Sequence, residues 1–144
     1  MVGKETAVGR FSVEFVLANN RDVVGLAPGT PVLESVKHVV LSGVVDSGAA
    51  RLVLPQRVVE HLQLRKEGEA IVRYADQRQE RRLLVSNVWL QLLGRHGVFS
   101  AIVEPERDDA LIGALVLEEL DLLVDWATQF LYPRRPDSIL AEIE

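Results

Sequence analysis

Short apolar runs, separated by turn-forming residues, dominate the pattern along this chain. Residues 11–17 alternate loosely between apolar and polar positions, and residues 36–45 are rich in valine. Both patterns are typical of β-strands, because β-branched side chains fit the pleated surface of a sheet. The same reasoning predicts further strands over residues 22–26, 52–54, 70–74, 82–93, 98–103, 122–125 and 129–132.

Two segments show helical spacing instead. Val58, Val59 and Leu62 follow Pro55 at the spacing of one helix face, which predicts a short helix ending near Leu64. Residues 114–120 predict a second short helix. Polar residues 75–81 are expected at a hairpin tip and residues 94–97 in a tight turn. Many short strands with turns between them favour a closed or folded-over β structure.

No repeat or linker interrupts the pattern, so residues 1–144 are expected to form a single domain. Its core spans about residues 10–133, and residues 134–144 form a charged tail that could pair with a second copy, form a short helix or be disordered. The 48% of apolar residues are enough for one hydrophobic core.

Charge and composition exclude several classes of function. The net charge of -5 argues against non-specific binding of nucleic acid, which needs a basic surface. The absence of cysteine excludes disulfides, thiol nucleophiles and zinc–thiolate sites. His38, His61 and His96 are scattered without the spacing of metal ligands.

No membrane partner is expected. The first ten residues contain no apolar segment typical of a signal peptide. The apolar stretch 111–126 contains too many carboxylates to span a bilayer: Glu118, Glu119, Asp121 and Asp125. These carboxylates are expected at a solvated helix end, with Asp125 closing a turn. A cytoplasmic protein is the simplest expectation.

The segment Asp46-Ser47-Gly48-Ala49 is the strongest candidate for chemistry. The valine-rich strand runs directly into Asp46, and a second apolar run, 52–54, follows shortly after. Asp, Ser and Gly are also common turn residues, so an ordinary turn is the alternative interpretation.

Together with the later run Leu111-Ile112-Gly113 and the helix after it, this order of elements resembles the retropepsin-like aspartic proteases, in particular the small single-lobe bacterial members. The resemblance covers about residues 10–133. It implies an all-β fold: a single-lobe closed barrel with one or two short helices. Asp46 would then be the catalytic carboxylate, and Ser47, Gly48 and Ala49 would support the active-site loop. Leu111, Ile112 and Gly113 would pack beside that loop.

The resemblance also assigns residues 73–79 to a flap, the hairpin that closes over substrate. Its substrate-binding residues would be Arg73, Tyr74, Ala75, Asp76 and Gln77. Related flaps carry glycine near the tip, whereas this one does not. We expect Ala75-Asp76 to form the turn, because Asp tolerates unusual backbone angles. Tyr74 would either face substrate or simply pack on a neighbouring strand.

One catalytic carboxylate is not sufficient for this chemistry. Two carboxylates held close together share one proton, so that one acts as base and the other as acid; aspartic proteases are the standard example. Because the chain contains one Asp-Ser-Gly, a homodimer would be needed to supply the pair. The implied activity is endopeptidase cleavage of extended peptide or protein substrates, without metal or cofactor and without nucleic acid.

Other interpretations stay open. The flap without glycine is compatible with a catalytically silent or weak module for peptide binding or dimerisation. A structural β-domain with an accidental Asp-Ser-Gly is the other possibility. The basic residues Arg78, Arg81 and Arg82 could form a solvated hairpin face, a nucleic-acid patch, or a preference for charged substrates.

Overall fold

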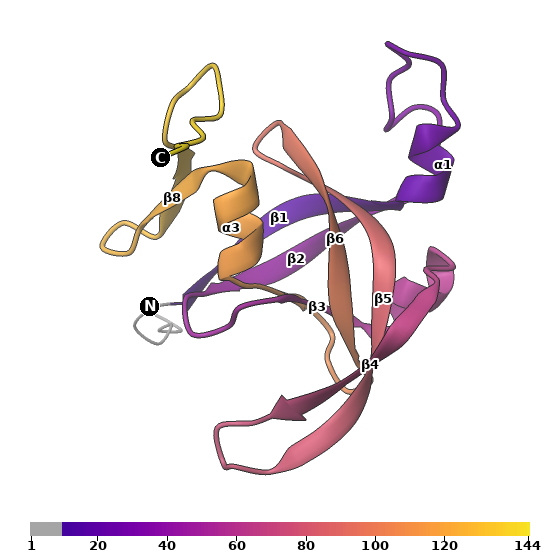
Figure 1. The fold of residues 1–144 in the computed structure, drawn as a ribbon, viewed down its shortest axis with the longest axis vertical. Coiled ribbons are helices and arrows are strands. Elements are labelled where there is room, and N and C mark those ends of the chain that lie inside the picture. Colours follow the sequence, from indigo (N-terminus) through magenta and orange to yellow (C-terminus); the bar gives the residue numbers. More distant parts are fainter. Residues whose placement is uncertain (1–9) are drawn as a thin grey trace.

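The computed structural model describes residues 10–144, and its main feature is a curled seven-stranded sheet (Figure 1). The strand order is β1-β2-β7-β3-β6-β5-β4, and an additional pairing of β1 with β5 closes six of the strands into a barrel. The expectation of a closed, all-β barrel is therefore confirmed. The strands are β1 (Arg10–Asn19), β2 (His38–Asp46), β3 (Leu52–Pro55), β4 (Lys66–Arg73), β5 (Gln79–Leu92), β6 (Arg95–Glu104) and β7 (Ala110–Ile112).

The barrel interior is filled by aliphatic side chains that alternate along the strands. Leu17, Val45, Leu54, Leu90 and Ile112 are fully buried there. They come from five different strands, so one continuous core holds the barrel together. Burial of apolar surface is the main stabilising term for such a core.

Of the three helices within residues 10–144, two agree with the predicted pattern. They are α2 (Gln56–His61), which follows Pro55, and α3 (Ala114–Leu120). Val116, Leu117 and Leu120 on α3 are buried, as helical spacing requires. Within residues 10–144, no helix has the length and apolar character needed to cross a bilayer.

The strand expected over residues 22–26 is wrong, because this segment forms most of helix α1 (Asn20–Val24). Asn19 explains the difference. Its side-chain oxygen accepts a hydrogen bond from the Arg21 amide at 3.0 Å, which caps the helix. Its amide nitrogen donates to the carbonyls of Leu62 and Gln63, both at 3.1 Å. A buried asparagine tied to a distant segment therefore ends the strand and starts the helix.

A separate two-stranded sheet follows α3, as the pattern predicted. It consists of β8 (Leu122–Asp125) and β9 (Phe130–Pro133). Leu122 and Leu131 anchor one face of this hairpin in the core. The Asp125 carboxylate closes the turn by accepting from the amides of Ala127 and Thr128, and its hydrogen bonds with Thr128 lower the pKa of Asp125.

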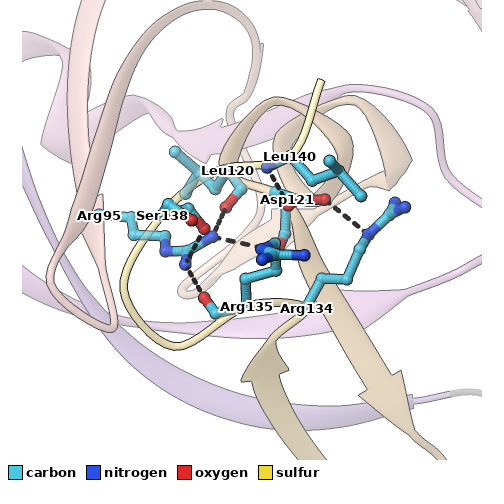
Figure 2. A network of polar contacts seen from close by, with 7 residues as sticks. All are labelled: Arg95, Leu120, Asp121, Arg134, Arg135, Ser138 and Leu140. Atoms are coloured by element: carbon cyan, nitrogen blue, oxygen red, sulfur yellow. Dashed lines mark hydrogen bonds and ion pairs between the residues drawn. The ribbon is translucent and has the colours of Figure 1, made fainter. Parts of the chain in front are cut away.

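The turn expected at residues 94–97 is shorter than predicted. Strand β6 already begins at Arg95, and the reversal is made at Leu93 and Gly94, which both have positive φ. Arg95 is thereby free to reach the C-terminal tail. Its guanidinium donates to the Leu120 carbonyl at 2.9 Å, to the Ser138 carbonyl at 2.8 Å and to the Arg135 carbonyl (Figure 2).

Asp121 holds the same tail from the other side (Figure 2). Its carboxylate pairs with Arg134 Nε at 2.9 Å and accepts from the Leu140 amide at 2.9 Å. Asp121 is buried, so its expected place at a solvated helix end is wrong. Residues 134–144 form no helix, and their backbone folds back onto the lobe around Arg95 and Asp121.

Candidate active site

Asp46 is the last residue of β2, at the rim of the barrel. The turn that follows fixes its carboxylate, because the Gly48 amide donates to Asp46 Oδ1 at 2.9 Å. The Ala49 amide donates to the Asp46 carbonyl at 3.2 Å. The Asp46 side chain is 15% exposed, while Ser47 and Gly48 lie exposed at the surface. Ser47 makes no side-chain hydrogen bond within the described part of its own chain, so its hydroxyl is accessible.

Arg10 engages the other oxygen of the same carboxylate. Arg10 Nη2 lies 3.2 Å from Asp46 Oδ2, and the antiparallel register of β1 and β2 places the two residues directly opposite each other. Sequence reasoning did not single out Arg10. Arg10 could have been found by pairing the predicted strands 11–17 and 36–45 in antiparallel register, because this register places it opposite Asp46.

The turn Asp46–Ala49 and the segment Leu111-Ile112-Gly113 lie close together. The Ala114 and Leu115 amides donate to the Ala49 and Ala50 carbonyls, each at 2.9 Å. A Cβ atom on Gly113 would lie 2.6 Å from the carbonyl carbon of Ala50, which no real Cβ tolerates. Gly113 is therefore required by the close approach of two backbones rather than by a positive φ.

The hairpin of β4 and β5 projects beyond the barrel, where the sequence placed the flap (Figure 1). The tip is closed by hydrogen bonds from the Gln77 amide to the Tyr74 carbonyl and from the Tyr74 amide to the Arg78 carbonyl, both at 2.9 Å. Ala75 and Asp76 form the turn, as expected, but the positive φ, 73°, belongs to the next residue, Gln77. Asp76 accepts from the Arg78 amide at 3.0 Å. A left-handed Gln costs about 1 kcal/mol, which a closed hairpin tolerates without glycine.

Tyr74 connects the flap to the barrel wall. Its hydroxyl donates to Glu104 Oε2, while Arg82 Nε donates to Glu104 Oε1 at 3.0 Å. Glu104 is only 8% exposed. Each oxygen of this buried carboxylate accepts one of these two hydrogen bonds, as buried polar groups generally do. Burial, followed by the hydrogen bond to Glu104 and its negative charge, raises the pKa of Tyr74. Tyr74 therefore does more than pack on a neighbouring strand. Sequence reasoning missed Glu104, and nothing in its local pattern marked it.

The basic residues of the flap point in different directions. The Arg78 guanidinium lies 4.4 Å from the centre of the Tyr74 ring, in cation–π geometry. Arg82 is directed inward to Glu104, whereas Arg81 pairs with Glu69 at 3.7 Å on the outside of the hairpin. These arginines therefore do not form one continuous patch.

A cleft of about 790 Å³ lies between the Asp46–Ala49 turn, the β4–β5 hairpin and the end of β6. Asp46, Gly48 and Ala49 line it from the turn, and Arg73, Tyr74 and Ala75 line it from the flap. Of the Leu111-Ile112-Gly113 segment, Leu111 reaches the cleft. Asp76, Gln77, Ile112 and Gly113 do not line it. Among the described residues, no three His, Asp or Glu side chains gather as a metal site requires.

The arrangement of elements is similar to that of a retroviral protease. The sequence matches no model of a protein family and no curated protein. The fold is similar to that of EIAV protease, solved in complex with the inhibitor HBY-793, with a TM-score of 0.55 and 16% sequence identity. The match covers 83% of this chain and 93% of that one. The fold of this chain is therefore retropepsin-like.

Proposed function

We propose that this chain is an aspartic endopeptidase that hydrolyses peptide bonds in extended peptides as a homodimer. The observation that carries the proposal is the position of Asp46. On a retropepsin-like fold, it ends a strand in an Asp-Ser-Gly turn and lines a cleft roofed by a hairpin. No other carboxylate in this cleft belongs to the catalytic turn.

The reaction needs a second carboxylate. One Asp46 takes a proton from water, whose oxygen forms a bond to the peptide carbonyl carbon. The carbon–nitrogen bond then breaks as the amide nitrogen receives a proton from the other carboxylate. Two ionised carboxylates at short distance repel each other, so a pair related by a two-fold axis shares one proton and supplies both roles.

The β8–β9 hairpin offers a surface that supports a dimer. The outer face of the β8–β9 hairpin exposes Phe130 and Tyr132, and Phe130 is 67% exposed. This hairpin pairs with no other strand of the described chain, so both of its edges have unpaired backbone groups. Exposed aromatic residues beside open strand edges are expected to associate with another strand or chain. A second copy seated here is the occupant that the proposal requires.

The cleft supports an extended peptide as substrate. The flap and the catalytic turn offer backbone groups on two sides of it, and Val53, Val72 and Ile102 supply apolar lining. A peptide bound as an added strand would gain affinity from backbone hydrogen bonds and selectivity from alternate side chains.

Incubation with a denatured protein or a peptide library, from acid to mildly alkaline pH, tests the activity. Wild type should cleave, and Asp46→Asn should not, because the amide cannot act as base. Asp22→Asn is the matched control, since Asp22 is exposed on α1 and lies outside the cleft. The proposal fails if the wild type shows no cleavage that Asp46→Asn abolishes.

The dimer is tested separately by sedimentation. Phe130→Glu should shift the protein toward monomer and reduce cleavage in parallel. Val24→Glu is the control, because Val24 is 70% exposed on α1 and is not part of the β8–β9 hairpin. Loss of the dimer in both variants, or in neither, would argue against this surface.

A silent peptide-binding module is the second candidate. The Arg10–Asp46 ion pair favours it, because Arg10 Nη2 already engages the carboxylate oxygen Oδ2 of Asp46. Peptide binding by both wild type and Asp46→Asn, with cleavage by neither, is the result that supports this alternative.

A further inference from the structure

The geometry points to a cleft that selects peptides with acidic side chains, through Arg51, Arg73 and Arg78. This inference rests on the proposed function, because it assigns the substrate class of the same cleft. It concerns the residues that flank the scissile bond rather than the chemistry at Asp46.

The cleft has the opposite charge to the molecule as a whole. Three carboxylates line it, those of Asp46, Glu104 and Glu106, whereas the whole chain has 21 acidic and 16 basic residues. The basic side chains that line it are six arginines: Arg10, Arg51, Arg73, Arg78, Arg82 and Arg107. A concave site in which one sign of charge predominates attracts ligands of the other.

Half of these arginines are already neutralised by the protein. Arg10 pairs with Asp46, and Arg82 pairs with Glu104. Arg107 Nη2 lies 2.9 Å from the Asp109 carboxylate. These three positive charges are therefore used to hold the site rather than to bind a ligand.

The remaining three have no carboxylate partner among the described residues. Arg73 and Arg78 flank Tyr74 on the flap, and Arg51 follows the catalytic turn. All three are exposed. A cation–π contact with the Tyr74 ring, whose centre is 4.4 Å away, holds the Arg78 guanidinium in place. A peptide in the cleft would thus meet free guanidinium groups from the flap and from the segment after the Asp46 turn. Arginine binds carboxylates in a bidentate manner.

An acidic peptide fits these observations better than nucleic acid. The net charge of -5 opposes a polyanion that extends beyond the cleft. Arg81 and Arg82 do not extend the basic surface, because each is paired with a glutamate. The Tyr74 ring is covered by Arg78, so it offers no open platform for stacking a base.

The test uses three pools of extended peptides that share randomised apolar residues at the centre and differ in the flanking positions, which are Glu, Gln or Lys. Competition within a mixture gives the ratio of kcat/KM between pools, which does not depend on how much enzyme is folded. The wild type should cleave the Glu pool about tenfold faster than the Gln pool, with the Lys pool slowest, as expected for two or three partly exposed charge pairs.

Arg73→Gln and Arg78→Gln should each reduce the preference for Glu over Gln roughly threefold. Arg81→Gln is the matched control, since it removes the same charge from the same hairpin outside the cleft. It should leave the preference unchanged. Equal cleavage of the three pools, or an equal effect of Arg81→Gln, overturns the inference while the protease function stands.

If no pool is cleaved, the same peptides separate the two proposals. Fluorescence anisotropy of a labelled Glu peptide with Asp46→Asn should show tighter binding than that of the Gln peptide, and the difference should shrink in Arg73→Gln. That result supports the selectivity although the protease function has failed. Equal binding of both peptides overturns it. Displacement of the Glu peptide by a single-stranded oligonucleotide at physiological salt also overturns it, in favour of nucleic acid.

Discussion

The Arg10 guanidinium and the Asp46 carboxylate form an ion pair at 3.2 Å across the first two strands of the barrel. In a single chain, the partner of the Asp46 carboxylate is therefore an arginine. In the proposed dimer, its partner is a second Asp46. The register of β1 and β2 places Arg10 beside Asp46, so the Arg10 guanidinium stabilises the negative charge of Asp46 in the single chain.

Arg10→Gln tests whether this ion pair opposes catalysis. Removing the cation should leave Asp46 Oδ2 free for water and for the second Asp46, so cleavage should be equal to or greater than that of the wild type. Because Arg10 is 56% exposed, the free energy of unfolding should change by less than about 1 kcal/mol. A tenfold loss of activity with unchanged stability would contradict this account and make Arg10 part of the machinery.

Gly113→Ala tests the close contact behind the catalytic turn. The added Cβ would lie 2.6 Å from the carbonyl carbon of Ala50, and only a backbone shift could relieve that clash. We expect a loss of about 1–3 kcal/mol in the free energy of unfolding, measured with urea. Gly68→Ala is the control, because nothing lies within 4 Å of its Cβ position. Equal stability of both variants would show that the two backbones are not packed this tightly.

Tyr74→Phe tests the connection between flap and barrel, and its effect depends on pH. The raised pKa of Tyr74 means that the folded state binds the phenolic proton more tightly than the unfolded state does. This contribution to stability is fully present below about pH 10, the ordinary tyrosine value, and is lost as pH rises through the folded pKa.

The wild type should therefore lose stability above about pH 10 more steeply than Tyr74→Phe does. Below that pH, the variant should be less stable by about 1 kcal/mol, the usual contribution of one hydrogen bond. Unfolding measured at neutral pH and in the alkaline range checks both points. Parallel pH profiles for the two proteins would mean that Tyr74 does not donate to Glu104 in solution.

Asp121→Asn tests how the tail is held. The amide side chain loses the charge that pairs with Arg134 and cannot accept on both atoms, so the Leu140 amide should lose its partner. Hydrogen exchange at Leu140 should accelerate at least tenfold. Arg135→Gln is the control, because only the backbone carbonyl of Arg135 contacts Arg95. Exchange as slow as in the wild type would show that the tail is held by other contacts.

Local pattern was sufficient to predict most of the barrel. The valine-rich strand that ends at Asp46, the helix after Pro55 and the helix over residues 114–120 all follow from periodicity and turn residues. The hairpin over β8 and β9 follows in the same way. Each of these elements is determined by residues close together in the sequence, which is the condition under which such patterns succeed.

The errors arose where distant residues decide the structure. Helix α1 depends on the hydrogen bonds of Asn19 to Leu62 and Gln63, more than forty positions away. The roles of Arg10 and Glu104 depend on strand register and on how the flap folds over β6. The turn at Ala75 and Asp76 was predicted correctly, but the positive φ of Gln77 was not, because it depends on the hydrogen bonds that close the hairpin.

Mixing wild type with Asp46→Asn at fixed total concentration tests the central claim most directly. If two Asp46 residues form the active site, only dimers with two wild-type chains are active, and activity should follow the square of the wild-type fraction. An equal mixture that has exchanged subunits should then show about one quarter of the wild-type activity. Activity proportional to the wild-type fraction, about one half in that mixture, would mean that each chain cleaves alone and would contradict the shared catalytic pair.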